Sequence, residues 1–314
     1  SRFAPWGILA LIVLSSFVLS FNASRGESAV MDELAHIPAG YSYVRYLDYR
    51  LNPEHPPLLK ALSALPLLFQ KLNFPTESRA WQKDVNGQWE VGNLFLYEST
   101  PAGGQAGNDA DQIIQWARLG PLLITLLLII FIYIWAKELM GRWWALLPAF
   151  LFAFSPTVLA HGHYVTTDVA AAFGTFIAIY YLTRYLLWPS RRDLIYAGLA
   201  FGVAQLMKFS TVLLIPLFIF IVVVYFFWKT RNEISGSSFI TGINRLLKSL
   251  WQAIFSLTLI FIIGYLLVYA VYFIFSINYP IEKQTSDTRF TLTSFAGGPD
   301  LNSQTCKLNS GLPI

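Results

Sequence analysis

All four histidines of the chain lie in two short segments that also carry carboxylates. Residues 31–57 hold His36 and His55, and residues 155–168 hold His161 and His163. Imidazole and carboxylate groups transfer protons near neutral pH, and imidazole is also a common metal ligand. Both segments adjoin long apolar runs, where ionisable side chains are costly and usually functional. The clustering therefore predicts a functional site at a membrane surface.

In the first segment, residues 31–36 read Met-Asp-Glu-Leu-Ala-His. If they are helical, Asp32 lies four residues and Glu33 three residues before His36, so the three side chains can approach one surface. A carboxylate that is partly desolvated has a raised pKa and can serve as a general base. The alternative is a solvated acidic pair that only favours the first turn of a helix. Asp32 and Glu33 are candidate catalytic residues.

Residues 52–57 read Asn-Pro-Glu-His-Pro-Pro. The three prolines fix the backbone around Glu54 and His55, which is useful where two polar side chains must be held in place. The alternative is a rigid turn before a helix that begins with proline. Glu54 joins the candidate catalytic residues, and the same prolines would hold His55 in place beside it.

The second segment, 155–168, ends in Asp168 and places His161 and His163 two residues apart. Asp168 and His161 are candidate ligands of a divalent metal ion, although no third ligand has the spacing of known zinc sites. Alternatively, Asp168 complements the N-terminus of a helix and the histidines lie at the interface. Two cations next to apolar runs, Arg118 and Lys208, could bind a phosphate or could simply extend towards the interface.

The composition places these segments in a polytopic membrane protein, because 55% of the 314 residues are hydrophobic and only 13% are charged. We predict an all-α bundle with about seven transmembrane helices. The apolar runs cover about 5–22, 117–136, 143–160, 169–188, 194–207, 211–228 and 251–275. In the fifth run, Gly198 and Gly202 have the small-residue spacing that allows close helix contact, or they are merely small residues in a helix. The net charge of +4 is spread between loops and predicts no nucleic-acid partner.

Basic residues predict the orientation, because Lys and Arg concentrate in short cytoplasmic loops. With the N-terminus inside, these loops contain Arg2, Lys137, Arg142, Arg184, Arg191, Arg192, Lys229, Arg231, Arg245 and Lys248. The long first loop, 23–112, is acidic instead, and we expect it to be exported with juxtamembrane helices near 56–72. Both histidine segments and Lys208 then share the non-cytoplasmic face. We expect a transmembrane domain at 1–275 and, at 276–314, an exported tail that begins a truncated C-terminal part.

The residues together resemble a known family, the membrane glycosyltransferases with the GT-C fold, in particular the lipid-carrier-dependent branch of protein O-mannosyltransferases and aminoarabinose transferases. The resemblance covers about residues 5–230. Its motifs are Asp32-Glu33, Pro-Glu-x-Pro-Pro at 53–57, Ala-Arg-Leu at 117–119, Ser155-Pro156 with Thr167-Asp168, and Ala-Gly-Leu-Ala-Phe-Gly at 197–202 leading to Lys208-Phe209.

The resemblance implies transfer of a sugar from a polyprenyl-phosphate carrier to a protein or lipid acceptor on the outer face of a bacterial or archaeal plasma membrane. It implies a base at Asp32, with Glu54 and Asp168 supporting the donor phosphate or a cation, and it implies no certain cofactor beyond a possible divalent metal ion. The set expected to bind the donor phosphate is His55, Arg118, Lys208 and His163. His55 stands where aminoarabinose relatives have lysine, so this contact would depend on pH.

The principal alternative function is a proton- or ion-coupled transporter with a relay of Asp, Glu and His. Against it, the polar groups cluster at one face, and the apolar runs lack ionisable residues near their centres.

Overall fold

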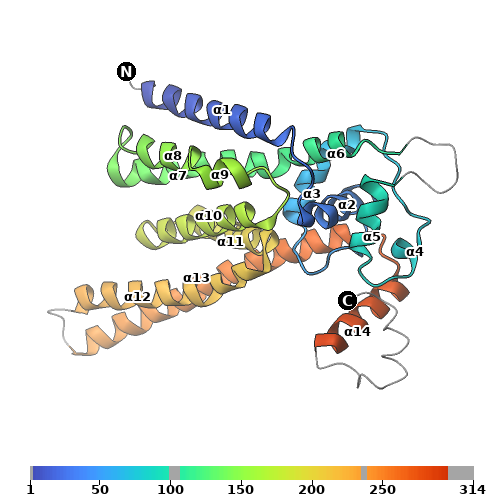
Figure 1. Cartoon of the computed structure of the whole chain (residues 1–314). Helices are drawn as coiled ribbons and strands as arrows, with labels where there is room; N and C mark the ends of the chain where they lie inside the picture. The colour runs from blue at the N-terminus through green and yellow to red at the C-terminus, as the bar shows by residue number, and fades with distance from the viewer. Residues whose placement is uncertain (1–2, 99–106, 235–238, 296–314) are drawn as a thin grey trace.

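The computed structural model describes residues 3–98, 107–234 and 239–295, and over these residues the chain is helical without a strand. Long helices run side by side in layers, and shorter helices of the first loop gather at one end of the bundle (Figure 1). Five helical segments are long and apolar enough to cross a membrane. They are α1 (Ala4–Ser24), α6 with α7 (Ala110–Ala117 and Leu119–Met140), α10 (Thr167–Leu187), η2 with α12 (Phe209–Leu213 and Leu214–Ile234) and α13 (Phe239–Phe275).

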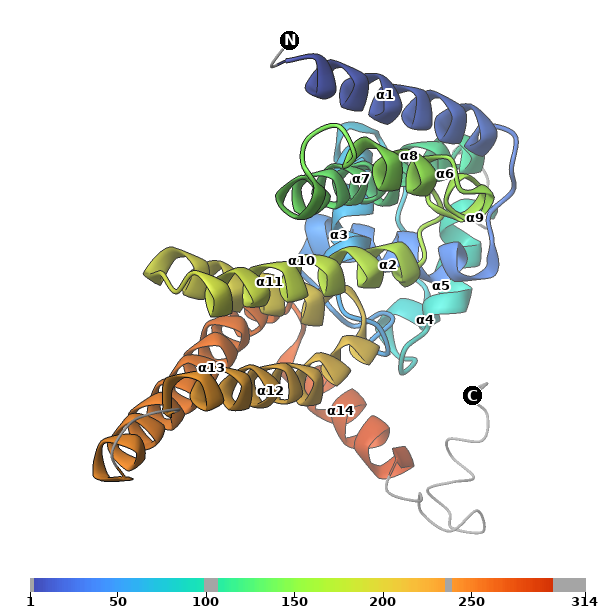
Figure 2. The same ribbon diagram turned by 90° about the vertical axis from the view of Figure 1, so that its left-hand side faces the viewer.

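Two of the seven predicted spans form shorter helices. The run at 143–160 is divided into α8 (Leu146–Ala153) and α9 (Pro156–His161), because Pro156 has no N–H to continue the first helix and instead begins the second. The fifth run forms α11 (Arg191–Met207), which has 17 residues. Both still lie along the bundle, α8 against α1 and α7 and α11 between α10 and α13 (Figure 2). A count of seven spans therefore stays a prediction.

Small residues bring α10, α11 and α13 into close contact. A Cβ on Gly174 would lie 2.7 Å from the Cα of Ala204, and one on Gly202 would lie 2.8 Å from the carbonyl oxygen of Gly264. Neither approach leaves room for a side chain, so these backbones touch directly. The predicted role of Gly198 and Gly202 in helix contact is confirmed, since Gly198 meets Ile263 of α13 in the same way.

The first loop forms a helical cap with an aromatic core. Its helices are α2 (Met31–Tyr46), α3 (Leu58–Ala64), η1 (Leu65–Phe69), α4 (Arg79–Gln82) and α5 (Gln88–Leu96). Phe74 contacts Tyr41 and Phe95 at ring-centroid distances of 5.7 and 5.2 Å. The expected juxtamembrane helix is α3 with η1: Leu59 and Leu67 are fully buried, whereas Phe69 is 93% exposed. The cap is thus packed onto the bundle rather than hanging from it.

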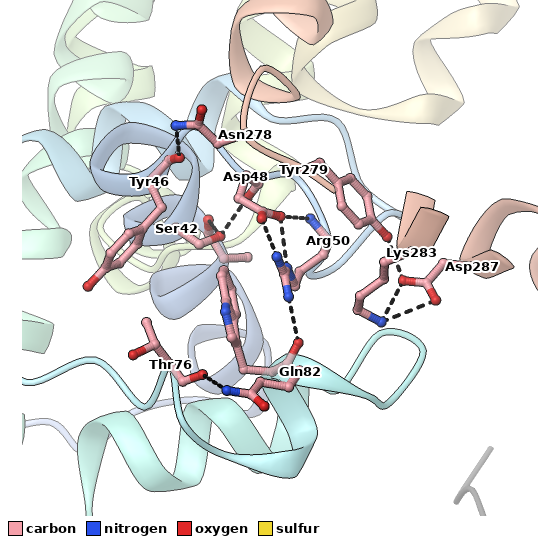
Figure 3. Close-up of polar contacts among 12 residues, drawn as sticks. Ser42, Tyr46, Asp48, Arg50, Thr76, Gln82, Asn278, Tyr279, Lys283 and Asp287 are labelled. Carbon is pink, nitrogen blue, oxygen red and sulfur yellow. Dashed lines mark hydrogen bonds and ion pairs between the residues drawn. The ribbon is translucent and has the colours of Figure 1, made fainter. Parts of the chain in front are cut away.

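The chain returns to this cap after α13, through α14 (Ile281–Phe295). The Asn278 side chain donates to the carbonyl oxygen of Tyr46 at 2.8 Å (Figure 3). Lys283 Nζ donates to the carbonyl oxygen of Asp84 at 3.0 Å. In the cap, Arg50 pairs with Asp48 and donates to the carbonyl oxygen of Trp81 at 2.8 Å. The start of the predicted tail is therefore fastened to the first loop, and 296–314 lies outside the described residues.

Candidate functional site

A buried ion pair joins the cap to the bundle. Arg118, at the junction of α6 and α7, is 1% exposed and Glu33, in the first turn of α2, is 0% exposed. Arg118 Nε and Nη2 donate to the two carboxylate oxygens of Glu33 at 2.9 and 2.7 Å. Glu33 also accepts the backbone N–H groups of Val30 and Val165, each at 3.0 Å. Glu33 thereby caps its own helix and fixes the start of α2 against residue 165, in the segment before α10.

The remaining N–H groups of Arg118 point to backbone carbonyls of the segment between α1 and α2. Nη1 donates to Ser24 and Glu27 at 2.9 and 3.1 Å, and Nη2 donates to Ser28 at 2.9 Å. A guanidinium with all its donors engaged inside protein has none left for a ligand. This geometry does not support the predicted phosphate role of Arg118 or the predicted catalytic role of Glu33. We assign both residues to holding the cap in place.

Beside this ion pair, the structure brings the two histidine segments together. The rings of His36 and His55 meet edge to face, with centroids 5.1 Å apart. His36 Nδ1 lies 2.7 Å from the carbonyl oxygen of Val165, which joins α2 to the segment before α10. There Asp168 forms an ion pair with Lys208, with Oδ1 and Nζ 2.5 Å apart. Residues separated by more than 170 positions are thus assembled at the end of the bundle that carries the cap.

The two imidazoles differ in their access to solvent. Burial, and secondly the charge of Lys60, lower the pKa of His36 to about 3, so its ring is neutral at physiological pH. His55 is only partly buried, and burial followed by the charge of Lys60 lowers its pKa as well. A neutral, accessible imidazole can donate one hydrogen bond and accept another.

Asp32 is exposed, in contrast to its neighbour Glu33. Burial has the largest effect on the pKa of His55, and among the weaker effects the charge of Asp32 raises this pKa and the charge of Lys208 lowers it. Both charged groups therefore lie within electrostatic range of an accessible imidazole. We refer to Asp32, His55, Asp168 and Lys208 as the polar cluster.

The proline-rich loop is held from inside by Lys60, a residue that the sequence did not single out for this site. Lys60 is fully buried, and Nζ donates to the backbone oxygens of Asn52 and His55, both at 2.8 Å. It also donates to Asn52 Oδ1 at 2.6 Å and to the hydroxyl of Tyr43 at 2.9 Å. Burial lowers the pKa of Lys60 well below its ordinary value, while this oxygen cage favours the ammonium form. No motif or spacing in the sequence pointed to this role of Lys60.

Glu54 points to the other side of the loop. Its carboxylate accepts a hydrogen bond from Asn86 Nδ2 at 2.9 Å and another from Gln88 Nε2. Gln88 in turn accepts from the Asn52 side chain. Glu54 is exposed, and these amides hold it towards the cap. Its predicted catalytic role stays a prediction, and the contacts describe a group that fixes the loop.

The histidines of the second segment separate from one another. His163 is fully buried and its Nε2 lies 2.7 Å from Glu27 Oε2, while Nδ1 has no partner. Burial raises the pKa of the Glu27 carboxyl, but hydrogen bonds from His163 and Tyr164 outweigh it and lower the pKa overall. A buried, carboxylate-bound His163 is poorly placed for the predicted contact with a donor phosphate.

His161 is exposed, and its ring lies 5.8 Å from that of Tyr164. Asp168, the other predicted metal ligand, is bonded to Lys208. Among the described residues, no group of three or more His, Cys, Asp or Glu side chains has the arrangement of a metal site. Metal binding by Asp168 and His161 therefore stays a prediction.

Comparisons with known proteins agree with this architecture. Residues 111–240 match the family model described as dolichyl-phosphate-mannose-protein mannosyltransferase. The fold is similar to the S. cerevisiae protein O-mannosyltransferase Pmt1-Pmt2 complex bound to the sugar donor, with a TM-score of 0.55 and 18% sequence identity over 87% of this chain. The chain spans 33% of the length of that protein chain. A search of curated proteins gives no match.

These findings confirm the GT-C fold that the sequence predicted, and the apolar helices make the chain an integral membrane protein. The matching segment includes α10, α11 and η2, and so it contains both Asp168 and Lys208 of the polar cluster.

Proposed function

We propose that the protein transfers a sugar from a polyprenyl-phosphate carrier to a hydroxyl group of a protein or lipid acceptor on the non-cytoplasmic face of the membrane. The observation that carries this proposal is the polar cluster itself. Asp32 is exposed, its charge and that of Lys208 both affect the pKa of His55, and Lys208 forms an ion pair with Asp168 at the end of the bundle that carries the cap. The basic bias of the short loops on the opposite side supports an exported position for the cap.

The chemistry needs few groups. The acceptor oxygen attacks the anomeric carbon of the sugar, the bond from that carbon to the phosphate oxygen breaks, and the polyprenyl phosphate leaves with the bonding electron pair. The acceptor proton goes to Asp32, whose exposure leaves its oxygens accessible. Because the leaving phosphate is already a weak base, the protein mainly has to activate the acceptor and stabilise the phosphate charge.

Lys208 is suited to the second task. Its side chain is 30% exposed and donates to the carboxylate of Asp168, whose side chain is 73% exposed. An exposed ion pair of this kind is weak, about 0–1 kcal/mol. A donor phosphate can therefore take a share of the Lys208 ammonium at little cost and form a charge-assisted hydrogen bond with it. His55 can supply a further hydrogen bond to the same phosphate in its neutral form.

The test compares two exposed aspartates, each in the first turn of a helix: Asp32 of α2 and Asp111 of α6. Asp→Asn at either position removes a similar helix-dipole contribution, so only the chemistry differs. In the full-length protein, assayed with a polyprenyl-phosphate sugar, Asp32→Asn should lower turnover by ~10²–10⁴-fold. Asp111→Asn should leave it near wild type. Wild-type turnover in Asp32→Asn would refute the assignment of the base.

Donor binding is tested in the same assay with Lys208→Ala. This variant should raise the KM for the donor with a smaller effect on kcat, because a phosphate contact is lost. Arg45→Ala, which removes an exposed cation from the last turn of α2, is the control. Equal KM values in the Lys208 and Arg45 variants would contradict a phosphate role for Lys208.

A further inference from the structure

A hollow lies in the bundle away from the cap. Helices α10, α11, α12 and α13 line a half-open cavity of about 610 Å³ whose wall is mostly aliphatic and aromatic, including Leu194, Val222, Phe226, Leu257 and Ile260. Cavities of this size hold small organic ligands. The cavity lies towards the C-terminal end of α12 and the N-terminal end of α13, at the end of the bundle opposite to the cap and the polar cluster (Figure 1).

The cavity persists because α13 presents small side chains to it. Ser249, Ala253 and Ser256 lie on one side of that helix, where larger residues would fill the space. Ser256 is bonded to the hydroxyl of Tyr185 at the end of α10, with the two oxygens 2.5 Å apart. The hydrogen bond satisfies both hydroxyls, so the wall there is closed without an unpaired polar group.

A smaller depression of about 410 Å³ adjoins the cavity and has the opposite character. It is lined by Lys229, Arg245, Lys248, Ser249 and Gln252, and it shares three of these residues, Lys229, Ser249 and Gln252, with the larger cavity. Arg191 adds a further cation to the wall of the cavity. Among the side chains that the structure describes, no carboxylate lines either space. An apolar chamber therefore continues into a rim of cations with hydroxyl and amide donors.

We propose that these two spaces form one binding site for an anionic glycerophospholipid of the cytoplasmic leaflet. The phosphate would contact Lys229, Arg245 and Lys248, in addition to the contacts these side chains already make, and an acyl chain would occupy the cavity. The charge complementarity selects an anionic over a zwitterionic lipid. The basic bias that predicts the cytoplasmic side includes these same residues, so the site is separate from the sugar-donor site and independent of the proposed function.

Trp251 lines the cavity and provides a probe. The full-length protein in mixed micelles is titrated with phosphatidylglycerol that carries bromine on its acyl chains, which quenches nearby tryptophan. The part of the fluorescence quenching that the Trp251→Phe variant no longer shows reports on this site. This Trp251-specific quenching should appear at a lower mole fraction of brominated phosphatidylglycerol than of brominated phosphatidylcholine. Equal curves for the two lipids would overturn the proposal, because an ordinary lipid-facing surface does not distinguish head groups.

Two variants test the two halves of the site. The double variant Arg245→Gln with Lys248→Gln should need a mole fraction of brominated phosphatidylglycerol roughly twentyfold to thirtyfold higher for the Trp251-specific quenching. This factor follows from about 1 kcal/mol for each basic residue near a membrane surface. The matched control, Lys137→Gln with Arg142→Gln, removes two cytoplasmic-loop cations that line neither space. It should change the required mole fraction of brominated lipid less than about twofold. Ala253→Phe should fill the cavity and abolish the Trp251-specific quenching.

Competition identifies the source of the anion. Unlabelled phosphatidylglycerol should displace the brominated lipid, whereas inorganic phosphate and polyprenyl phosphate should not. Displacement by polyprenyl phosphate at an equal mole fraction would overturn the assignment to a glycerophospholipid. Equal effects of the Arg245/Lys248 and Lys137/Arg142 double variants would overturn the placement of the head group.

Discussion

Replacement of Arg118 by alanine should unfold the cap rather than weaken substrate binding. The variant removes a guanidinium that bonds Glu33 twice and three backbone carbonyls once each. Glu33 is then left as a fully buried carboxylate with only two backbone N–H partners. Removing one member of a buried ion pair typically costs 3–5 kcal/mol, since the other charge stays uncompensated, so we expect a loss of about that size.

The measurement is the free energy of unfolding in mixed micelles of non-ionic detergent and dodecyl sulfate, followed by circular dichroism. Lys208→Ala is the matched control, because it also removes a cation bonded to a carboxylate. Its partners are exposed, and its loss should cost at most about 1 kcal/mol. If Arg118→Ala instead kept wild-type stability and lost donor affinity, Arg118 would be a phosphate ligand and the structural assignment would be wrong.

The other predictions concern the groups around the polar cluster. Lys60→Met should lower kcat by up to ~10²-fold, because residues 52–57 would be displaced. It should also raise the pKa of His55 that is seen in the pH dependence of activity, because the nearby charge of Lys60 is gone. An unchanged pH dependence would contradict this role of Lys60. The pKa of His36 is about 3 in the folded protein against 6.5 when unfolded. The unfolded state therefore binds the extra proton, and stability should fall by about 1.4 kcal/mol from pH 7.5 to pH 5.5 on account of His36 alone. Unfolding titrations at both pH values should show a smaller loss in His36→Gln, and an equal loss would disprove the assignment.

Much of the bundle could be predicted from sequence because hydrocarbon demands long apolar runs and because an all-helical span satisfies its own backbone. The runs that became α1, α7, α10, α12 and α13 are of this kind. Residues 143–160 were less predictable, since apolar content alone does not reveal that Pro156 divides the run into two helices. The apolar pattern of residues 143–160 predicted a hydrophobic segment correctly, but it did not predict the break in helical hydrogen bonding before Pro156.

The candidate site was predictable in its members and less so in their roles. Sequence spacing gave equal standing to Asp32 and Glu33, yet one is exposed and the other fully buried. Which of two adjacent carboxylates meets a buried arginine depends on the direction in which α2 packs, and that direction is set by contacts with residues 118 and 165 far along the chain. Lys60 could not be recognised from the sequence either, because its role depends on hydrogen bonds to backbone carbonyl groups that only the folded loop directs towards it.

The position of α11 has a consequence for how the protein is made. This helix has 17 residues, begins with two arginines and an aspartate, and its buried face is rich in alanine and glycine. Such a segment gains little by entering lipid alone. Its glycines meet α13 at distances that admit no side chain, and Ile263 and Gly264 of α13 are synthesised more than sixty residues after them. Stable membrane insertion of α11 must therefore wait for a later helix, so a chain interrupted before α13 would expose α11 to the quality-control proteases of the membrane even though every residue of the polar cluster had already been translated.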